Sequence, residues 1–343
     1  MGVFHFGERR DIAVKAIITG ANGFVGSNLA RRLLEEGWDV AGIVRKTSDL
    51  TFLSGLGLHL TDIGLESTDQ IARAFDGADV VYHCASRASD WGPIDVFRES
   101  NVENTRRVML AAAAAGVGRV VYIGSTVVYG FRGHVNTDEV GAKSPATFPY
   151  CVTKLEAEWQ VEEIARDKGL DYVIIRPGNV FGPYDRVTTI ELYKFLLAGK
   201  FAHVSGGRAL TCPTYVENLI DAIVLAATAA NSACEDFIIT DGLHITWREY
   251  IEKTCEILGA PLPRFSVPAG PVYAAAIVAE GLYKLVGART PPPITRYRIS
   301  QVRNNYHFSI EKARRLLDFE PRVGLDEAIR RTAQWYRGEN SHS

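Results

Sequence analysis

The sequence predicts an α/β protein built on a doubly wound parallel sheet, with a smaller, mainly helical region in its C-terminal part. Strand-like apolar runs alternate with helical patterns along the first half of the chain, which is typical of parallel sheets. A glycine-rich turn joins the first of these strands to the first helix. The length of 343 residues, with 47% hydrophobic and 23% charged residues, suits one large domain or a domain with a cap.

The order of the elements follows from these patterns. We expect strands at residues 14–19, 39–44, 79–84, 119–123, 172–176 and 237–240, and helices at 27–36, 69–75, 102–115 and 149–168. From about Tyr184 onward the pattern is mainly helical, with a break at Pro291–Pro293. We therefore expect a mobile leader at 1–12, a first domain at 13–185 and a second region at 186–343, from which a strand at 236–240 returns to the sheet.

The glycine turn has the pattern expected of a phosphate cradle. Gly20, Gly23 and Gly26 follow the apolar strand and precede the first helix. Glycine allows positive φ and close approach of the backbone, while the first amides of a helix offer unpaired donors. The alternative is a glycine turn without a ligand. The predicted contacts to a dinucleotide in this turn are Gly20, Asn22, Gly23, Phe24, Val25 and Gly26. Residues 13–185 are thus expected to form a dinucleotide-binding domain.

A phenol and an ammonium lie four residues apart at Tyr150 and Lys154, with Ser125 upstream. Positions i and i+4 share one face of a helix, so both side chains point into the same space if residues 149–168 are helical. A cation one turn away would lower the pKa of the phenol and make it a better base. This pattern favours proton transfer; the alternative is a solvated helix face with one Tyr and one Lys.

With these motifs in order, the chain resembles an extended short-chain dehydrogenase/reductase, a family with a Rossmann fold. Asn101–Thr105 resembles another motif of the family, with Asn104 where glycine is usual. The resemblance implies that Ser125, Tyr150 and Lys154 are catalytic. It also implies contacts to the cofactor from Asp62 and Ile63 near the adenine, from Ala85 and Ser86, from Lys154, and from Pro177, Gly178 and Val180 near the nicotinamide.

The end of the second strand indicates which cofactor is used. Sites for NAD(H) place an acidic residue there, which binds the ribose hydroxyls. In this chain Val44 is followed by Arg45 and Lys46, two cations that suit a 2′-phosphate. NADP(H) is therefore favoured, and NAD(H) is the alternative if Arg45 and Lys46 are only solvated loop charges.

The trio implies a mechanism. Ser125 would donate a hydrogen bond to the substrate carbonyl, and Tyr150 would give it a proton during reduction or take one during oxidation. Lys154 would hold the nicotinamide ribose. Thr126, beside Ser125, is a candidate substitute donor. A non-catalytic dinucleotide sensor would need the glycine cradle without this trio.

The substrate class depends on the C-terminal half. Nucleotide-sugar epimerases and dehydratases of this family commonly carry an Arg-Asp pair just before the segment that Tyr215–Asn218 resembles, but this chain has Thr211 and Cys212 there. Arg208 could compensate, and Asn179 lies where those enzymes contact a phosphate. Residues 88–92, 291–297 and 306–313 instead resemble the branch of 3β-hydroxysteroid dehydrogenases and 2-alkyl-3-oxoalkanoate reductases, which handle apolar alcohols and ketones. Candidate substrate contacts are Trp91, Thr126, Asn179 and Tyr215.

Residues 267–288 form a strongly apolar stretch with Glu280 and Lys284 as its charges. Prolines and charges interrupt it too often for a membrane span. Two interpretations of this stretch are left open. It is either a helix of the core or of a dimer interface, or a helix that lines a pocket or lies on a membrane surface.

Composition limits the partners. A net charge of −2 without a basic patch excludes the usual nucleic-acid footprint. Five scattered cysteines without ligand spacing predict a reducing, cytoplasmic location and no metal. The expected partner is a small apolar carbonyl or alcohol, with peripheral membrane contact as an option. The family resemblance implies a homodimer through helices 102–115 and 150–168.

Overall fold

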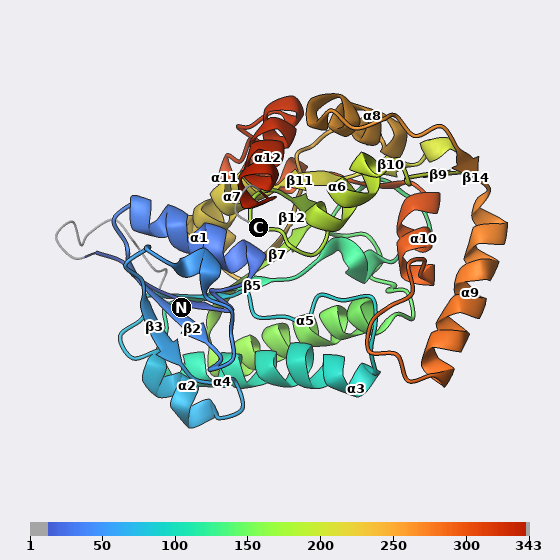
Figure 1. Cartoon of the computed structure of the whole chain (residues 1–343). Coiled ribbons are helices and arrows are strands. Elements are labelled where there is room, and N and C mark those ends of the chain that lie inside the picture. Colours follow the sequence, from blue (N-terminus) through green and yellow to red (C-terminus); the bar gives the residue numbers. More distant parts are fainter. Residues whose placement is uncertain (1–12, 341–343) are drawn as a thin grey trace.

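The computed structural model describes residues 13–340, so the expected leader at 1–12 lies outside the described residues. Its centre is a seven-stranded sheet in the order β12-β7-β5-β4-β1-β2-β3 (Figure 1). Every neighbouring pair in this sheet is parallel. The strands are β1 (Lys15–Thr19), β2 (Asp39–Val44), β3 (His59–Asp62), β4 (Val80–His83), β5 (Arg119–Ile123), β7 (Asp171–Pro177) and β12 (Glu235–Ile239). The predicted doubly wound sheet is confirmed.

Helices cover both faces of the sheet, which makes three layers. One apolar core lies between the sheet and α1 (Phe24–Glu35), α7 (Val216–Thr228), α11 (Glu311–Leu317) and α12 (Leu325–Asn340). The other lies beneath α2 (Thr68–Ala74), α4 (Asn104–Ala115) and α5 (Pro149–Lys168). Strands β4 and β5 are buried along their whole length, as expected for parallel strands covered on both faces. The apolar runs Val80–Tyr82 and Val120–Ile123 within them suit this double burial.

The helix predicted at 102–115 begins differently from the prediction. The short α3 (Ile94–Phe97) leads into a π-helix at Arg98–Glu103, and α4 starts only at Asn104. The periodicity of the sequence does not reveal this wider turn, which contains Asn101 and its tertiary contacts described below. Helices α4 and α5 both end at left-handed glycines, Gly116 and Gly169.

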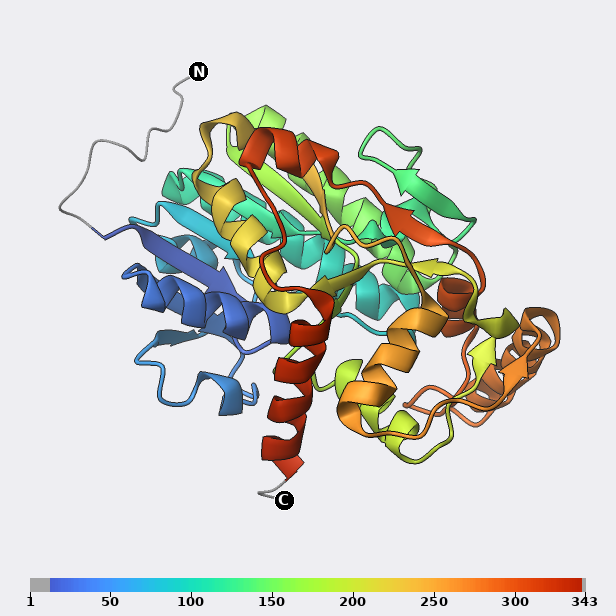
Figure 2. The same ribbon diagram turned by 90° about the horizontal axis from the view of Figure 1, so that it is seen from above.

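Smaller elements build the region over the carboxyl edge of the sheet. Its helices are α6 (Thr189–Leu197), α8 (Trp247–Leu258), α9 (Ala269–Leu285) and α10 (Arg296–Arg303). Its short pairs are β8 (Asn179–Phe181) with β11 (Pro213–Tyr215), β9 (His203–Val204) with β14 (Ser266–Val267), β10 (Leu210–Thr211) with β13 (Ile245–Thr246), and β6 (His134–Thr137) with β15 (Tyr306–Phe308). Figure 2 shows these elements to one side of the main sheet.

The apolar stretch at 267–288 forms β14 and α9. Of the residues in α9, only Ala276 and Glu280 are buried, so this is not a core helix. Within the described residues, no helix combines the length and apolar character that crossing a membrane requires.

Candidate active site

The glycine turn leaves β1 at the carboxyl edge of the sheet and enters α1. Gly20 has a φ of +69°, and a Cβ placed there would lie 2.7 Å from the Cα of Ala85. A Cβ on Gly26 would overlap the carbonyl oxygen of Gly20. These approaches require glycine at positions 20 and 26. They also bring Ala85, another predicted cofactor contact, beside the cradle.

The N-terminus of α1 faces this turn without a side-chain cap. Gly23 is the N-cap residue and has no side chain to accept from the first amides. The amides of Phe24, Val25 and Gly26 are in the first turn and have no acceptor within the helix. Together with the positive end of the helix dipole, they form an anion site that fits a dinucleotide pyrophosphate.

The predicted adenosine contacts meet at the next strand ends. Val44, the last residue of β2, is in register with Asp62, the last residue of β3. Arg45 and Lys46 follow Val44 and are exposed, as is Asp62. The structure thus brings the two cations and Asp62 to the same edge of the sheet, beyond the glycine turn.

Lys154 is anchored beneath the carboxyl end of β5. Its ammonium donates to the carbonyl of Ile123 at 2.6 Å and to the hydroxyl of Tyr122 at 3.3 Å. The side chain is buried, and burial lowers its pKa to about 8, against an opposing effect of the nearby Glu158 carboxylate. Helix α5 therefore holds the Lys154 ammonium in a fixed position, and its pKa of about 8 lies close to neutral pH.

Tyr150 lies one turn before Lys154 and is hydrogen-bonded to Ser125. Ser125 follows β5 and begins a short 3-10 helix, Thr126–Tyr129. Burial raises the pKa of Tyr150 to about 12, although the hydrogen bond with Ser125 lowers it. The lowered phenol pKa that the sequence predicted is therefore not present in this structure. The reason is that Tyr150 loses solvent, while the Lys154 ammonium is directed to Ile123 and Tyr122.

Three of the candidate substrate residues are engaged within the protein. Thr126 donates to the carbonyl of Pro177 at 3.2 Å and accepts from Tyr306 at 3.0 Å, so its hydroxyl is occupied. Tyr215 is fully buried and donates to Glu217 at 2.7 Å. Asn179 donates to Thr211 at 3.1 Å and accepts from Gln301 at 2.6 Å. These contacts fix Thr126, Tyr215 and Asn179 within the protein, and their roles at the substrate stay predictions.

Trp91 lies in the loop after β4, as expected, and contacts the far end of α9. Its indole N–H donates to the carbonyl of Ala288 at 2.9 Å, and its ring packs edge-on against Tyr283 at 6.4 Å. Trp91 thereby connects this loop to α9.

The segments around Pro177 are held by close packing. A Cβ on Gly178 would lie 2.7 Å from the carbonyl oxygen of Cys212 and 2.9 Å from the hydroxyl of Thr214. Gly178 therefore lets β7 pass into β8 directly beside β11. Three predicted cofactor contacts, Pro177, Gly178 and Val180, lie together at the carboxyl end of β7. Another, Ser86, lies beyond the carboxyl end of β4, and its hydroxyl donates a hydrogen bond to Asn101.

Two residues near the site were not among the predicted site residues. Asn101, in the π-helix, bonds the backbone of Arg87 and donates to the Thr153 hydroxyl at 3.1 Å, which links the β4 loop to α5. The sequence indicated Asn101 through the family motif at 101–105. Tyr297 of α10 places its ring 6.5 Å from that of Tyr150. The sequence analysis used the segment 291–297 only as part of the family resemblance. No local pattern predicts that Tyr297 contacts Tyr150, which is far away in the chain.

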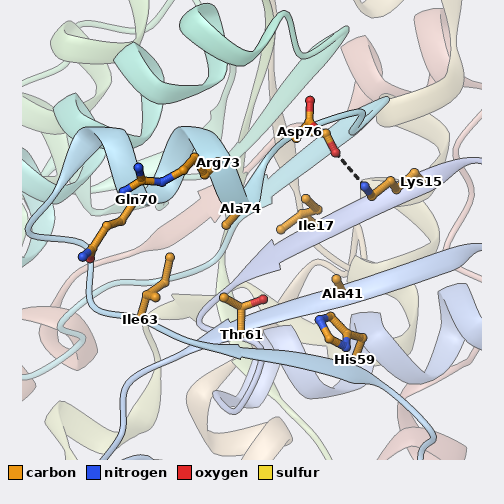
Figure 3. A pocket seen from close by; sticks show the side chains of 10 residues that line it. All are labelled: Lys15, Ile17, Ala41, His59, Thr61, Ile63, Gln70, Arg73, Ala74 and Asp76. Carbon is orange, nitrogen blue, oxygen red and sulfur yellow. Dashed lines mark hydrogen bonds between the residues drawn. The ribbon is translucent and has the colours of Figure 1, made fainter.

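A separate groove of about 570 Å³ lies between α2 and strands β1, β2 and β3 (Figure 3). Of the predicted site residues it contains Ile63, while the Lys15 ammonium at its end donates to the carbonyl of Asp76 at 2.6 Å. Ser125, Tyr150 and Lys154 lie elsewhere, the first just after β5 and the other two on α5.

The match to known families agrees with this site. A model of the NAD dependent epimerase/dehydratase family matches residues 16–239. The chain belongs to this family. It is therefore an enzyme of the extended short-chain dehydrogenase/reductase type that uses a nicotinamide dinucleotide on CH–OH or C=O groups, and the resemblance inferred from its motifs is confirmed.

Individual relatives cover nearly the whole chain. The chain is 30% identical over 326 residues to the 2-alkyl-3-oxoalkanoate reductase of Stenotrophomonas maltophilia, covering 93% of this chain and 98% of that protein. It is 30% identical to 3beta-hydroxysteroid-dehydrogenase/decarboxylase isoform 1 of Arabidopsis thaliana, covering 92% of this chain and 78% of that protein. The crystal structure of gox2253 is 28% identical, with a TM-score of 0.79 and coverage of 96% of this chain and 99% of that one.

Proposed function

We propose that this family member interconverts a secondary alcohol and a ketone on an apolar substrate, of the hydroxysteroid or 3-oxo acid type. The observation that carries the proposal is the aromatic surrounding of Tyr150. Tyr297 lies beside the Tyr150 ring, and Phe148 packs edge-on against Tyr297 at 5.5 Å. An aromatic wall favours apolar groups beside the reacting carbon. The relatives named for oxoalkanoate and hydroxysteroid substrates support the same class.

The roles of the residues follow from their positions. Ser125 donates to the substrate oxygen, and Tyr150 transfers the proton to or from that oxygen. The bound nicotinamide supplies or accepts the hydride. Lys154, fixed by Ile123, holds the ribose beside Tyr150. A phenol with a pKa of about 12 is protonated at neutral pH, so Tyr150 can act as the acid when a carbonyl is reduced.

Replacing Tyr150 by Phe tests the proton transfer. Tyr150→Phe should reduce kcat by about 10²-fold or more, because the general acid is lost, while the Kd of NADPH changes little. Tyr297→Phe is the matched control, since it removes a hydroxyl from the neighbouring ring. Turnover would be followed by nicotinamide absorbance with steroid ketones, 3-oxo acids and nucleotide sugars. Near wild-type activity in Tyr150→Phe contradicts the role of Tyr150, and oxidation of NADPH by nucleotide sugars alone contradicts the substrate class.

NADP(H) is the proposed cofactor, with NAD(H) as the alternative. Arg45 and Lys46 are exposed where β2 ends, and cations there can pair with a 2′-phosphate. Arg45→Asp should shift the ratio of NADPH to NADH affinity toward NADH by about tenfold or more. The measurement is the Kd of each cofactor for both proteins. An unchanged ratio would show that Arg45 is only a solvated charge.

A nucleotide-sugar epimerase or dehydratase remains the second candidate, because the family description includes both reactions. Against it, Thr211 and Cys212 are buried where those enzymes carry an arginine. Arg208 is exposed nearby and is the remaining cation for a diphosphate. An epimerase regenerates its cofactor, so it would convert the sugar without net change in absorbance.

The proposed assembly is a homodimer through α4 and α5. Trp159 of α5 is 53% exposed, which is unusual for an indole on a helix otherwise packed on the sheet. The mass in solution, measured by light scattering, checks this, and Trp159→Glu should yield the monomer.

A further inference from the structure

His83, the last residue of β4, is a buried imidazole between two threonine hydroxyls. Its Nδ1 lies 2.7 Å from the hydroxyl of Thr19, the last residue of β1. Its Nε2 lies 2.9 Å from the hydroxyl of Thr105 in α4. None of the three side chains is more than 1% exposed. Buried polar groups need such partners, because they have lost their hydration. His83 therefore links two central strands to helix α4.

The hydrogen bonds beyond the two threonines determine which imidazole nitrogen carries the proton. Thr105 donates its own hydroxyl proton to the carbonyl of Asn101 at 2.6 Å, so its oxygen is the acceptor for a proton on Nε2 of His83. On the other side, Thr19 accepts from the amide of Ala85 at 3.4 Å and donates its hydroxyl proton to Nδ1. A proton on Nδ1 instead would set lone pairs of Nε2 and Thr105 against each other.

The surroundings of His83 keep its ring neutral. Burial, and to a smaller extent the nearby Lys154 ammonium, lowers the pKa of His83 to about 3. A neutral imidazole has one donor and one acceptor, and the two threonines present one acceptor and one donor to it. The hydrogen bonds therefore run in one direction, from the Ala85 amide through the imidazole to the Asn101 carbonyl.

At one end these hydrogen bonds reach the glycine turn. Thr19 directly precedes Gly20 in the sequence. The Ala85 amide that donates to Thr19 belongs to the residue that packs against this turn, because a Cβ on Gly20 would lie 2.7 Å from the Cα of Ala85. The hydrogen bonds of His83 thus hold the end of the strand from which the turn departs.

At the other end they reach helix α5, which packs against α4 (Figure 1). Asn101 belongs to the π-helix, a kind of turn that is frequent at functional sites. Its side-chain amide donates to the hydroxyl of Thr153 at 3.1 Å. Thr153 lies on α5 between Tyr150 and Lys154. We call this series of hydrogen bonds the His83 network; its side chains are Thr19, His83, Thr105, Asn101 and Thr153, and all five are buried.

We propose that His83, as a neutral imidazole with its proton on Nε2, is a positioning residue that fixes the glycine turn relative to the helix carrying Tyr150 and Lys154. The inference rests on the proposed function, because a dinucleotide bound at the turn must place its nicotinamide beside Tyr150 when hydride and proton reach one substrate. A misplacement of about 1 Å between reacting groups can slow a reaction about 10²-fold. His83 itself exchanges no proton with the substrate and acts through the network.

Thr105→Val tests the network without changing the imidazole. Valine has the shape of threonine without its hydroxyl, so the Nε2 proton loses its acceptor, whereas Thr105→Ser keeps the hydroxyl and is the matched control. With NADPH and the steroid ketones and 3-oxo acids, kcat should fall about tenfold or more in Thr105→Val and stay near wild type in Thr105→Ser. The Kd of NADPH should change by less than about threefold in both, because the pyrophosphate contacts remain. Thr19→Val and Thr19→Ser repeat the comparison from the other side of the ring, so the test does not depend on one variant folding.

The position of the proton is measured by ¹⁵N–¹H NMR of the imidazole side chains in the full chain. The signals of His83 are identified by their loss in His83→Gln. At neutral pH and without cofactor, we expect a single neutral tautomer with a proton on Nε2 and none on Nδ1. In Thr105→Val this tautomer should no longer be the only one, because its acceptor is gone.

Three results overturn the positioning role while the proposed function stands. They are a proton on Nδ1 of His83, a positively charged ring at neutral pH, and equal kcat in Thr105→Val and Thr105→Ser in an enzyme that turns over. A lower Tm of Thr105→Val with unchanged kcat belongs to the third result, because the network would then stabilise only the core. If the wild type oxidises NADPH with none of these substrates, the proposed function fails and the positioning role fails with it.

Discussion

Lys154 shows how one buried side chain can link pH to cofactor binding. Its pKa of about 8 results from burial, which disfavours the charged ammonium. The cation is therefore present below pH 8 and is lost as the pH rises through this value. If the ammonium holds the nicotinamide ribose, affinity should follow the same direction.

We expect the Kd of NADPH to be level between pH 7 and the pKa of Lys154, and to rise by up to about tenfold per pH unit above it. Lys154→Met should bind more weakly, with a Kd that does not change over this interval. Fluorescence titration of both proteins is the measurement. A wild-type Kd independent of pH up to about 9.5 would separate cofactor binding from the charge of Lys154.

The turn between β1 and α1 depends on glycine at defined points. A Cβ at position 26 would overlap the Gly20 carbonyl oxygen, so the turn must open to accept alanine. Opening would move the amides of the first turn of α1, which are the proposed contacts to a pyrophosphate. We therefore expect cofactor affinity and stability to change together in this element.

Gly26→Ala should weaken NADPH binding about tenfold or more and reduce the free energy of unfolding by about 1–3 kcal/mol. Gly281→Ala is the control, because Gly281 lies within α9 and a Cβ there meets nothing within 4 Å. That control should be neutral or stabilising by up to about 1 kcal/mol. Calorimetric titration and chemical denaturation measure the two effects; equal behaviour of the two variants would contradict the steric account.

Across the whole molecule, a buried ionic network joins helix α5 to the sheet. Arg176 of β7 donates to both oxygens of Glu158 at 2.9 Å, and both side chains are fully buried. Arg176 also pairs with Asp236 of β12 at 2.6 Å, and Lys312 of α11 pairs with the same carboxylate at 2.7 Å. Glu158 follows Lys154 by one helical turn, so this network sets the position of α5.

Glu158→Gln should lower the free energy of unfolding by about 3–5 kcal/mol, because the buried guanidinium loses its paired charge. Lys194→Met is the control: its pair with Glu191 is more than half exposed and should contribute under about 1 kcal/mol. Urea denaturation measures both. A loss in Glu158→Gln no larger than in Lys194→Met would show that Asp236 alone satisfies Arg176.

Local patterns were sufficient for much of the fold and the cofactor cradle. The bounds of α5 follow from Pro149 at its start and Gly169 after its end, and both signals are local. The glycine turn was equally readable, because the spacing of its glycines and its place between a strand and a helix are local features. The sequence alone therefore predicted the parallel sheet, the cradle and the pairing of Tyr150 with Lys154 on one helix face.

Other properties arise from contacts between residues far apart in the chain. The raised pKa of Tyr150 results from its burial, and the position of Tyr297 beside it results from packing between α5 and α10. The same holds for α9, whose apolar composition fits a core helix equally well until its neighbours are placed. Composition and spacing encode periodicity and turns, whereas solvent exclusion and charge pairing exist only once the layers have assembled. That is why a role for Ser125, Tyr150 and Lys154 could be predicted from the sequence, whereas the direction of the Tyr150 pKa shift and the exposure of α9 came from the folded chain.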